Sequence, residues 1–231
     1  MAELGLGSPK IMWFTSRDRL VELTGNLCIL TGTLGRIGNE VYIGQKSEVD
    51  ELSEGFRPGK VGSSTMPHKR NPFIPGEIVS YSRLSRSVMV DALTSMEGTN
   101  ERDVRTIGVE DEFLARACCL ADAALDQAIL LMEDLEVHEE KIKRNLELSG
   151  GLVFAEALMM QLSGQYGRLE SHELVYELAQ KAISQHRDFR SILLEDGRIT
   201  AVLTEEALDD IMKPDHYVGL SEYFVENVVG K

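Results

Sequence analysis

The sequence has no long apolar run and no recognisable export signal. No segment approaches the roughly 20 consecutive apolar residues that a membrane-spanning helix needs. The first residues, Met1 to Gly5, contain neither a basic segment nor an apolar one, so we expect no signal peptide. Both absences argue against a membrane protein and favour the cytoplasm as the compartment.

Cysteine is also scarce, with three residues in a chain of 231, and none of them lies in a Cys-x-x-Cys pair. No group of histidines has the spacing of a metal site. Cys118 and Cys119 fall within an apolar helical run, where reduced and buried thiols are expected. We therefore expect no metal ion and no cofactor.

Positive charge is outweighed by negative charge, since 24 Lys and Arg face 38 Asp and Glu for a formal net charge of −14. A phosphate backbone attracts basic surfaces, so this balance argues against a nucleic acid as the main partner. An apolar content of 43% and a charged content of 27% are typical of globular proteins. The length suffices for one large domain or two small ones.

Helical periodicity is the main pattern that the sequence does contain. A long helix is expected to begin near Thr15, and its apolar residues are spaced alternately by three and four positions, which is a heptad pattern. Glycines interrupt this helix at a cost of about 1 kcal/mol each relative to alanine. The pattern favours a core helix of a tight bundle whose neighbours come close to the glycines. The heptad residues are Leu20, Leu23, Leu27, Leu30, Leu34, Ile37 and Val41, and the glycines are Gly25, Gly32, Gly35 and Gly38.

The remaining chain is predicted to be helical as well. A second long helix is expected from about Pro75 to near Gly98 and a third from about Val109 to Glu133. Shorter helices are expected near residues 138–147, 151–164, 169–186, 204–212 and 219–228. No segment alternates with period two for long enough to form a strand. The sequence therefore predicts an all-α fold, with a long-helix bundle over residues 1–133 and a small helical domain over residues 134–231.

A polar loop, residues 57–73, separates the first two long helices. It contains the run Gly62-Ser63-Ser64-Thr65-Met66-Pro67-His68-Lys69-Arg70-Asn71-Pro72. Adjacent hydroxyls, three basic side chains and an amide gather here with little apolar material. Such a loop in an acidic chain suits the binding of an anion, and long loops on rigid scaffolds are often functional. A solvated basic loop is the structural alternative.

This run matches the signature G-S-x-x-M-x-x-K-x-N, through which the sequence resembles the fumarase/aspartase superfamily of lyases. Its version here resembles the branch that contains adenylosuccinate lyase and 3-carboxy-cis,cis-muconate cycloisomerase. The resemblance implies a homotetramer whose active sites combine residues from several subunits. It also implies a small dicarboxylate-type substrate, from which a proton is removed next to a carboxylate before a leaving group departs.

The resemblance also assigns roles within the loop. Ser63 would be the catalytic base, and Lys69 and Asn71 would hold the substrate carboxylate. The developing aci-carboxylate needs cations and hydrogen-bond donors, and a free serine is a weak base that must be activated. A serine that caps its own turn is the alternative for Ser63. The residues that would line the closed loop are Ser64, Thr65 and Met66.

Two arginines outside the loop are further candidates. Arg102 lies in Glu101-Arg102-Asp103, which resembles the H-E-R-D segment of adenylosuccinate lyase and would make Arg102 an anion clamp. A surface cluster of ion pairs is the alternative. Arg17 precedes Asp18 as in an Arg-Asp pair of the same branch, although Asp18 also suits a helix N-terminus. His68 is not assigned a role, because the acid histidine of related lyases comes from an earlier segment.

Departures from the family pattern bear on the substrate. Gly76 stands where adenylosuccinate lyase has a glutamate, with Glu77 beside it, and Asn100 replaces the histidine of H-E-R-D. Residues 106–108 lack the serine that helps to bind a nucleotide phosphate. These departures weaken the resemblance to adenylosuccinate lyase, whereas residues 13–22 and 150–231 are more similar to 3-carboxy-cis,cis-muconate cycloisomerase, which also lacks that glutamate. Adenylosuccinate lyase is the alternative, and an inactive oligomerising scaffold is an alternative of another class. Chains of the family are about twice as long, so we expect a C-terminal portion that is inactive by itself.

Overall fold

The computed structural model describes residues 14–56 and 69–230, together with residues 3, 5, 7, 10 and 66. The chain divides into two compact units, residues 1–139 and 140–231. Residues 134–139, which the sequence analysis groups with the second domain, lie in the first unit. Their place there follows from a short strand, β2 (Glu136–Val137), that pairs with β1 (Leu52–Ser53) of the same unit.

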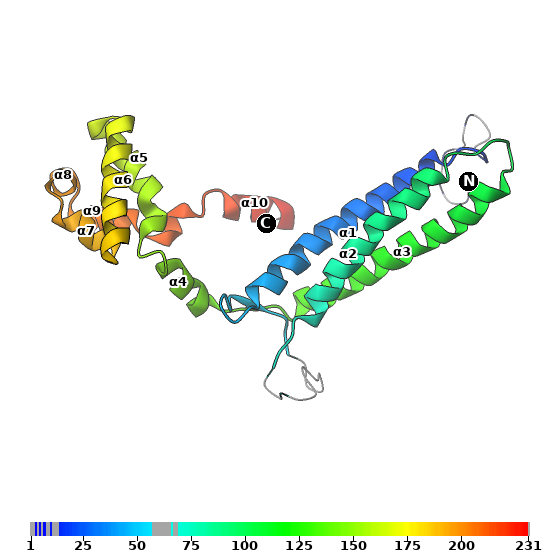
Figure 1. The fold of residues 1–231 in the computed structure, drawn as a ribbon, viewed down its shortest axis with the longest axis horizontal. Helices are drawn as coiled ribbons and strands as arrows, with labels where there is room; N and C mark the ends of the chain where they lie inside the picture. Colours follow the sequence, from blue (N-terminus) through cyan, green and yellow to red (C-terminus); the bar gives the residue numbers. More distant parts are fainter. Residues whose placement is uncertain are drawn as a thin grey trace. The chain divides into compact units, whose positions relative to one another are not determined.

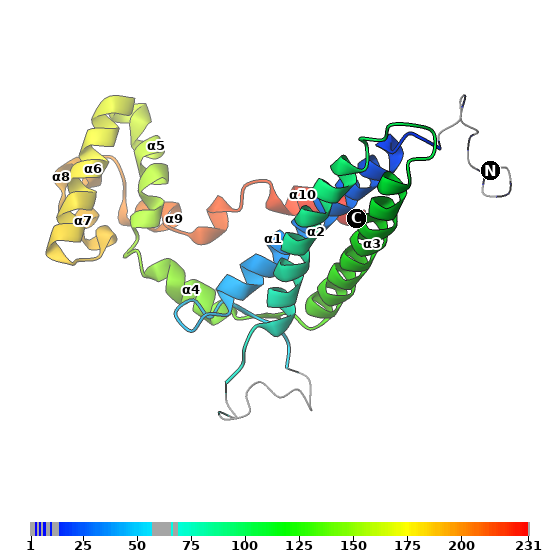
Figure 2. The ribbon, with the colours of Figure 1, turned by 45° about the vertical axis from the view of Figure 1, so that its right-hand side comes forward.

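Three long helices make up most of the first unit: α1 (Asp18–Gly44), α2 (Phe73–Thr94) and α3 (Val104–Glu133). They lie side by side, and α2 runs opposite to α1 and α3 (Figures 1 and 2). Two clusters of buried apolar side chains join them, one around Val41, Ile78 and Leu131 and the other around Val88 and Phe113. This arrangement confirms the predicted all-α fold with a bundle of long helices.

Two of these helices begin earlier than the sequence predicts. The second begins at Phe73 rather than Pro75, and the third begins at Val104 rather than Val109. At the start of α3, the Asp103 carboxylate accepts a hydrogen bond from the backbone N–H of Arg105 at 3.1 Å. An aspartate that caps the first turn in this way stabilises a helix start. The charged segment before Val109 therefore forms the first turn of α3.

Small residues form the inner face of α1. A Cβ added at Gly35 would lie 2.5 Å from Ser82 Oγ, and one added at Gly38 would lie 2.9 Å from the Pro75 carbonyl oxygen. These two glycines therefore allow α2 to approach closely, as predicted. At Gly25 and Gly32, by contrast, an added Cβ would meet no atom of the described chain within 4 Å.

The heptad residues of α1 fall into two sets. One set packs against α2 and α3, whereas the other set points away from them. Half of the predicted apolar seam is thus unused inside the first unit. The packed set is Leu20, Leu27, Leu34 and Val41, and the outer set is Leu23, Leu30 and Ile37, which are 44%, 37% and 38% exposed.

A two-residue antiparallel ladder closes one end of the bundle. Leu52 of β1 is opposite Val137 of β2, and Ser53 is opposite Glu136. Because β1 follows α1 and β2 follows α3, the ladder fastens the chain that enters the signature loop to the chain that leaves the bundle.

Short helices around one apolar core form the second unit. The core takes side chains from α5, α6, α7 and α9, including Leu158, Leu178, Phe189, Ile192 and Leu208. The elements are α4 (Glu139–Glu147), which begins at the boundary, η2 (Leu152–Phe154), α5 (Ala155–Tyr166), α6 (Arg168–Gln185), α7 (Phe189–Glu195), α8 (Gly197–Thr200), α9 (Glu205–Ile211), η3 (Pro214–Tyr217) and α10 (Ser221–Val229).

Across the described residues, no helix combines the length and apolar character that a membrane span requires. Cys118 and Cys119 were expected to be buried, but both are exposed. The reason is that α3 turns Phe113, Ala117 and Ala121 inward, which leaves the two thiols on its outer side.

Candidate active site

The signature loop is described in part. Ser63, Ser64, Thr65 and His68 lie outside the described residues. Met66 and Lys69 are exposed, and the Lys69 backbone N–H donates a hydrogen bond to the Met66 carbonyl oxygen at 3.0 Å. Lys69 lies four residues before Phe73, the first residue of α2.

Asn71 is half-buried beside a pocket of about 600 Å³ on the surface of α1 and α2. Its carbonyl oxygen accepts a hydrogen bond from the Phe73 backbone N–H at 2.9 Å. Tyr42 of α1 and Glu77 and Arg83 of α2 also line the pocket. Its volume falls in the range of small-molecule sites. An amide, a carboxylate and a guanidinium around one pocket are suited to a polar, carboxylate-bearing ligand.

Gly76 lines the pocket at the position where the resemblance to adenylosuccinate lyase implies a glutamate. A Cβ at Gly76 would lie 3.5 Å from the ring of Tyr42, which is an ordinary van der Waals distance, so packing does not restrict this position to glycine. Glu77 is exposed and faces the pocket. The sequence reasoning did not single out Tyr42 or Arg83, because neither belongs to the signature.

A polar cluster lies at the foot of the loop. Ser53 Oγ donates a hydrogen bond to Glu136 Oε2 at 3.0 Å and lies 3.4 Å from His138 Nε2. On the other side of the ring, His138 Nδ1 is 2.9 Å from the Asp50 carbonyl oxygen. Arg70 NH1 reaches to 3.9 Å from Glu136 Oε2. These contacts tie both sides of the loop to the β1–β2 ladder.

Glu54, which the sequence reasoning also missed, is buried between the two sides of the loop. Its Oε2 accepts a hydrogen bond from the Ile74 backbone N–H at 2.8 Å, and its own N–H donates to Gln45 Oε1 at 3.0 Å. No spacing pattern in the sequence indicates this role, because the partner is a main-chain group 20 residues away.

Arg17 lies at the opposite end of the bundle, where it is 8% exposed. Its Nε is 2.5 Å from Glu110 Oε2 of α3, and its NH1 donates a hydrogen bond to the Phe14 carbonyl oxygen. Arg102 is exposed, and its guanidinium lies 5.7 Å from the centre of the Phe14 ring. The two candidate arginines are therefore neighbours around Phe14.

Arg102 is followed by a tightly paired cap. Arg105 NH2 lies 2.6 Å from Asp103 Oδ2, and the Thr99 backbone N–H donates to the same oxygen at 3.2 Å. The hydrogen bonds from Arg105 hold the pKa of Asp103 well below its ordinary range. Asp103 and Arg105 thus stabilise the start of α3, which leaves Arg102 as the arginine of this segment that is not paired with Asp103.

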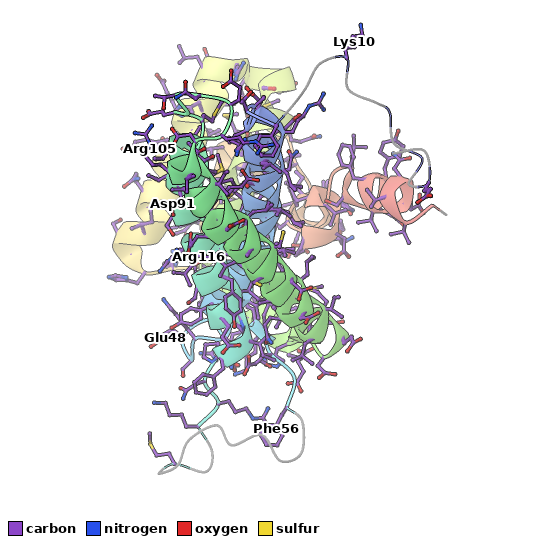
Figure 3. All side chains as sticks on the ribbon, turned by 90° about the vertical axis from the view of Figure 1, so that its right-hand side faces the viewer. Lys10, Glu48, Phe56, Asp91, Arg105 and Arg116 are labelled. Carbon is purple, nitrogen blue, oxygen red and sulfur yellow. The ribbon has the colours of Figure 1, made fainter. Side chains whose placement is uncertain are left out.

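Within one chain, the candidate residues that the structure describes lie at two separate ends of the bundle. Lys69 and Asn71 precede α2, and Arg102 follows it, so the 22 residues of α2 separate them by about 33 Å. Phe56, on the loop side, and Arg105 lie at opposite ends of the bundle (Figure 3). Among the described residues, no group of three or more His, Cys, Asp or Glu side chains is arranged to hold a metal ion.

Comparison with known families assigns both units to one group of enzymes. A family model described as "Lyase" matches residues 2–81, which include the signature loop. A second model, described as "Adenylosuccinate lyase C-terminus", matches residues 151–228 of the second unit.

Individual relatives and solved structures agree with these models. The 3-carboxy-cis,cis-muconate cycloisomerase of Pseudomonas aeruginosa is 38% identical over 229 residues, which cover 99% of this chain and 50% of the relative. The adenylosuccinate lyase of Methanocaldococcus jannaschii is 38% identical over 215 residues, covering 92% and 46%. The crystal structure of 3-carboxy-cis,cis-muconate lactonizing enzyme from Pseudomonas putida superposes with a TM-score of 0.88 at 33% identity, covering 99% of this chain and 50% of that one.

The chain spans about half the length of the curated relatives that it matches. Within that half, sequence similarity and fold agree over nearly every residue. The chain therefore belongs to the fumarate lyase superfamily, in the branch that contains adenylosuccinate lyase and 3-carboxy-cis,cis-muconate cycloisomerase.

Proposed function

We propose that the protein carrying this chain is a β-elimination lyase or cycloisomerase that acts next to a substrate carboxylate, with an activity of the 3-carboxy-cis,cis-muconate cycloisomerase type. The observation that carries this proposal is the 38% identity to the Pseudomonas aeruginosa cycloisomerase across 99% of the chain. The solved structure of a lactonizing enzyme with the same fold over 99% of the chain supports it.

The loop end of the bundle supplies the chemistry in this proposal. In the elimination direction Ser63 removes the proton next to the carboxylate. In lactone formation, which is the reverse addition, Ser63 returns a proton to that carbon while an oxygen of another substrate carboxylate adds to the double bond. Lys69 and Asn71 hold the activating carboxylate as negative charge develops on it. Both holding residues precede α2 and so lie near the positive end of its helix dipole, which favours an anion. Ser64, Thr65 and Met66 line the loop around the substrate.

The arginines require a second copy of the chain to take part. Arg17 and Arg102 lie about 33 Å from Lys69 and Asn71 along the length of α2, so they cannot reach the same substrate within one chain. An antiparallel neighbour would bring its arginine end to the loop end of the first chain. We therefore propose a homotetramer with composite sites, and we expect the chain alone to be inactive.

Activity of the complete gene product tests the proposal. Purified protein is supplied with 3-carboxy-cis,cis-muconate, and lactone formation is followed by the loss of absorbance of the conjugated diene. Ser63→Ala is expected to lower kcat by about 10²- to 10⁴-fold, as the loss of a general acid–base group does. Ser87→Ala is the matched control, because Ser87 is exposed on α2 and only bonds the Leu84 carbonyl oxygen. Full activity of Ser63→Ala on the true substrate would show that the base is another group.

Adenylosuccinate lyase activity is the second candidate, because the model of that enzyme's C-terminal region matches residues 151–228. Release of fumarate from adenylosuccinate, measured in the same preparation, separates it from the cycloisomerase. A helical scaffold without chemistry predicts no turnover of either substrate or of other succinyl adducts. The intact set of Ser63, Lys69 and Asn71 argues against that third reading, since a scaffold has no use for it.

A further inference from the structure

Glu54 joins the two sides of the signature loop. It follows β1, is 5% exposed, and accepts a hydrogen bond from the Ile74 backbone N–H at 2.8 Å. Glu54 precedes the loop and Ile74 follows it, so this hydrogen bond links the two sides of the loop. A buried carboxylate is costly unless it is hydrogen-bonded, which makes an incidental placement of this group unfavourable.

The first turn of α2 has no capping side chain of its own. Its N-cap residue is Pro72, and no side chain at that position accepts a hydrogen bond from the helix. The first N–H groups of a helix need acceptors from outside the helix, and a negative charge is favourable there. Glu54 supplies both from across the loop.

Glu54 is itself held in place by α1 and by the chain after α3. Its backbone N–H donates to the side-chain oxygen of Gln45, the C-cap residue that follows α1. A Cβ at the next residue, Gly55, would lie 2.3 Å from the Asp134 carbonyl oxygen, so only glycine fits at this contact. The preceding residue, Ser53, is paired with Glu136 in the ladder. These contacts fix the backbone at Glu54, so its carboxylate can hold the start of α2 at a fixed position.

We propose that Glu54 is a positioning residue for the elimination reaction. By holding the Ile74 N–H, it fixes the first turn of α2 and with it the residues immediately before that turn, Lys69 and Asn71. This inference rests on the proposed function, in which those two residues hold the substrate carboxylate. A displacement of about 1 Å in such groups is enough to cost about a hundredfold in rate.

Three variants and two readouts test the inference in the complete gene product. Glu54→Ala removes the acceptor, Glu54→Gln keeps a neutral acceptor oxygen, and Glu48→Ala removes an exposed carboxylate from the same connecting segment (Figure 3). Hydrogen exchange of the peptide at the start of α2 reports the contact, and kcat and KM report positioning. Ala121→Gly, in the interior of α3, serves as a control of similar stability loss.

Glu54→Ala is expected to speed exchange at the start of α2 by about tenfold and to lower kcat by about tenfold to a hundredfold, with KM changed by less than about threefold. Glu54→Gln is expected to keep both the exchange rate at the start of α2 and kcat close to their parental values. Glu48→Ala and Ala121→Gly keep the parental kcat once the folded fraction is accounted for. If Glu54→Ala does not fold, Glu54→Asp replaces it in the test. The shorter side chain cannot reach the Ile74 N–H, so we expect the same faster exchange at the start of α2 and the same lower kcat.

The inference is overturned if Glu54→Ala, or Glu54→Asp in its place, leaves the hydrogen-exchange rate at the start of α2 at the parental value. Faster exchange with an activity loss no greater than that of Ala121→Gly also overturns it, because Glu54 is then a cap without influence on the reaction. A parent protein that turns over none of the substrates refutes the proposed function instead. The exchange data still decide in that case whether Glu54 holds the start of α2.

Discussion

Arg17 is committed to contacts within its own unit. Its guanidinium is buried against the Glu110 carboxylate and the Phe14 carbonyl oxygen, and these contacts fasten the start of α1 to α3. A buried charge that loses its partner remains costly, because it is desolvated without compensation. A structural role for Arg17 therefore competes with the substrate-binding role that the family resemblance implies.

Replacement of Arg17 distinguishes these two roles. Arg17→Met is expected to lower the free energy of unfolding of the first unit by about 3 kcal/mol, because Glu110 is left without its counter-charge. Adding Glu110→Leu is expected to restore much of that loss, and Arg19→Met, at an exposed position, changes little. Denaturant unfolding measures all three. Unchanged stability together with a higher KM in the complete enzyme would support the substrate-binding role instead.

Individual residues differ in how far the sequence reveals them. Ser63, Lys69 and Asn71 belong to one continuous signature, so a local pattern is enough to single them out. Glu54 and Arg17 act through partners at Ile74 and Glu110, which the fold alone brings near. Such long-range contacts leave no spacing in the sequence, and for Glu54 the partner is a backbone group that carries no residue identity at all.

The α1–α2 interface depends on particular glycines rather than on glycine content. Gly35→Ala is expected to destabilise the first unit by about 2 kcal/mol, because its Cβ would overlap Ser82. Gly25→Ala on the same helix is expected to stabilise it by about 1 kcal/mol, since the position is open within the described chain and alanine favours a helix. Chemical denaturation of both variants measures the difference. A similar loss in both would mean that helix bending, and not close packing, explains the glycines.

Helix existence was easier to predict than helix ends or short helices. The period of apolar residues identified the three long helices, but α3 begins five residues early because Asp103 caps it. The sequence reasoning missed α7 and α8, which have seven and four residues. Segments this short do not complete enough turns to show a period. They are held instead by capping aspartates, Asp188 and Asp196, and by the core residues Phe189 and Ile199.

At the scale of the molecule, the candidate site is divided between the two ends of one bundle. The sequence places the signature and Arg102 about 30 residues apart, which suggests proximity as readily as separation. The structure puts the full length of α2 between them (Figure 3). Helical periodicity cannot reveal this division, because it fixes the faces of a helix and not the connections between helices.

The outer seam of α1, formed by Leu23, Leu30 and Ile37, has no partner helix in the described first unit and predicts self-association. Leu30→Glu is expected to shift the chain toward the monomer, because it places a charge in the middle of that seam. Ile183→Glu on α6 is the matched control, since Ile183 is exposed on the second unit and lies outside the seam. Sedimentation velocity at micromolar concentration measures the change. A parent chain that sediments as a stable monomer would contradict the seam as an interface, and an equal effect of both variants would place the interface elsewhere.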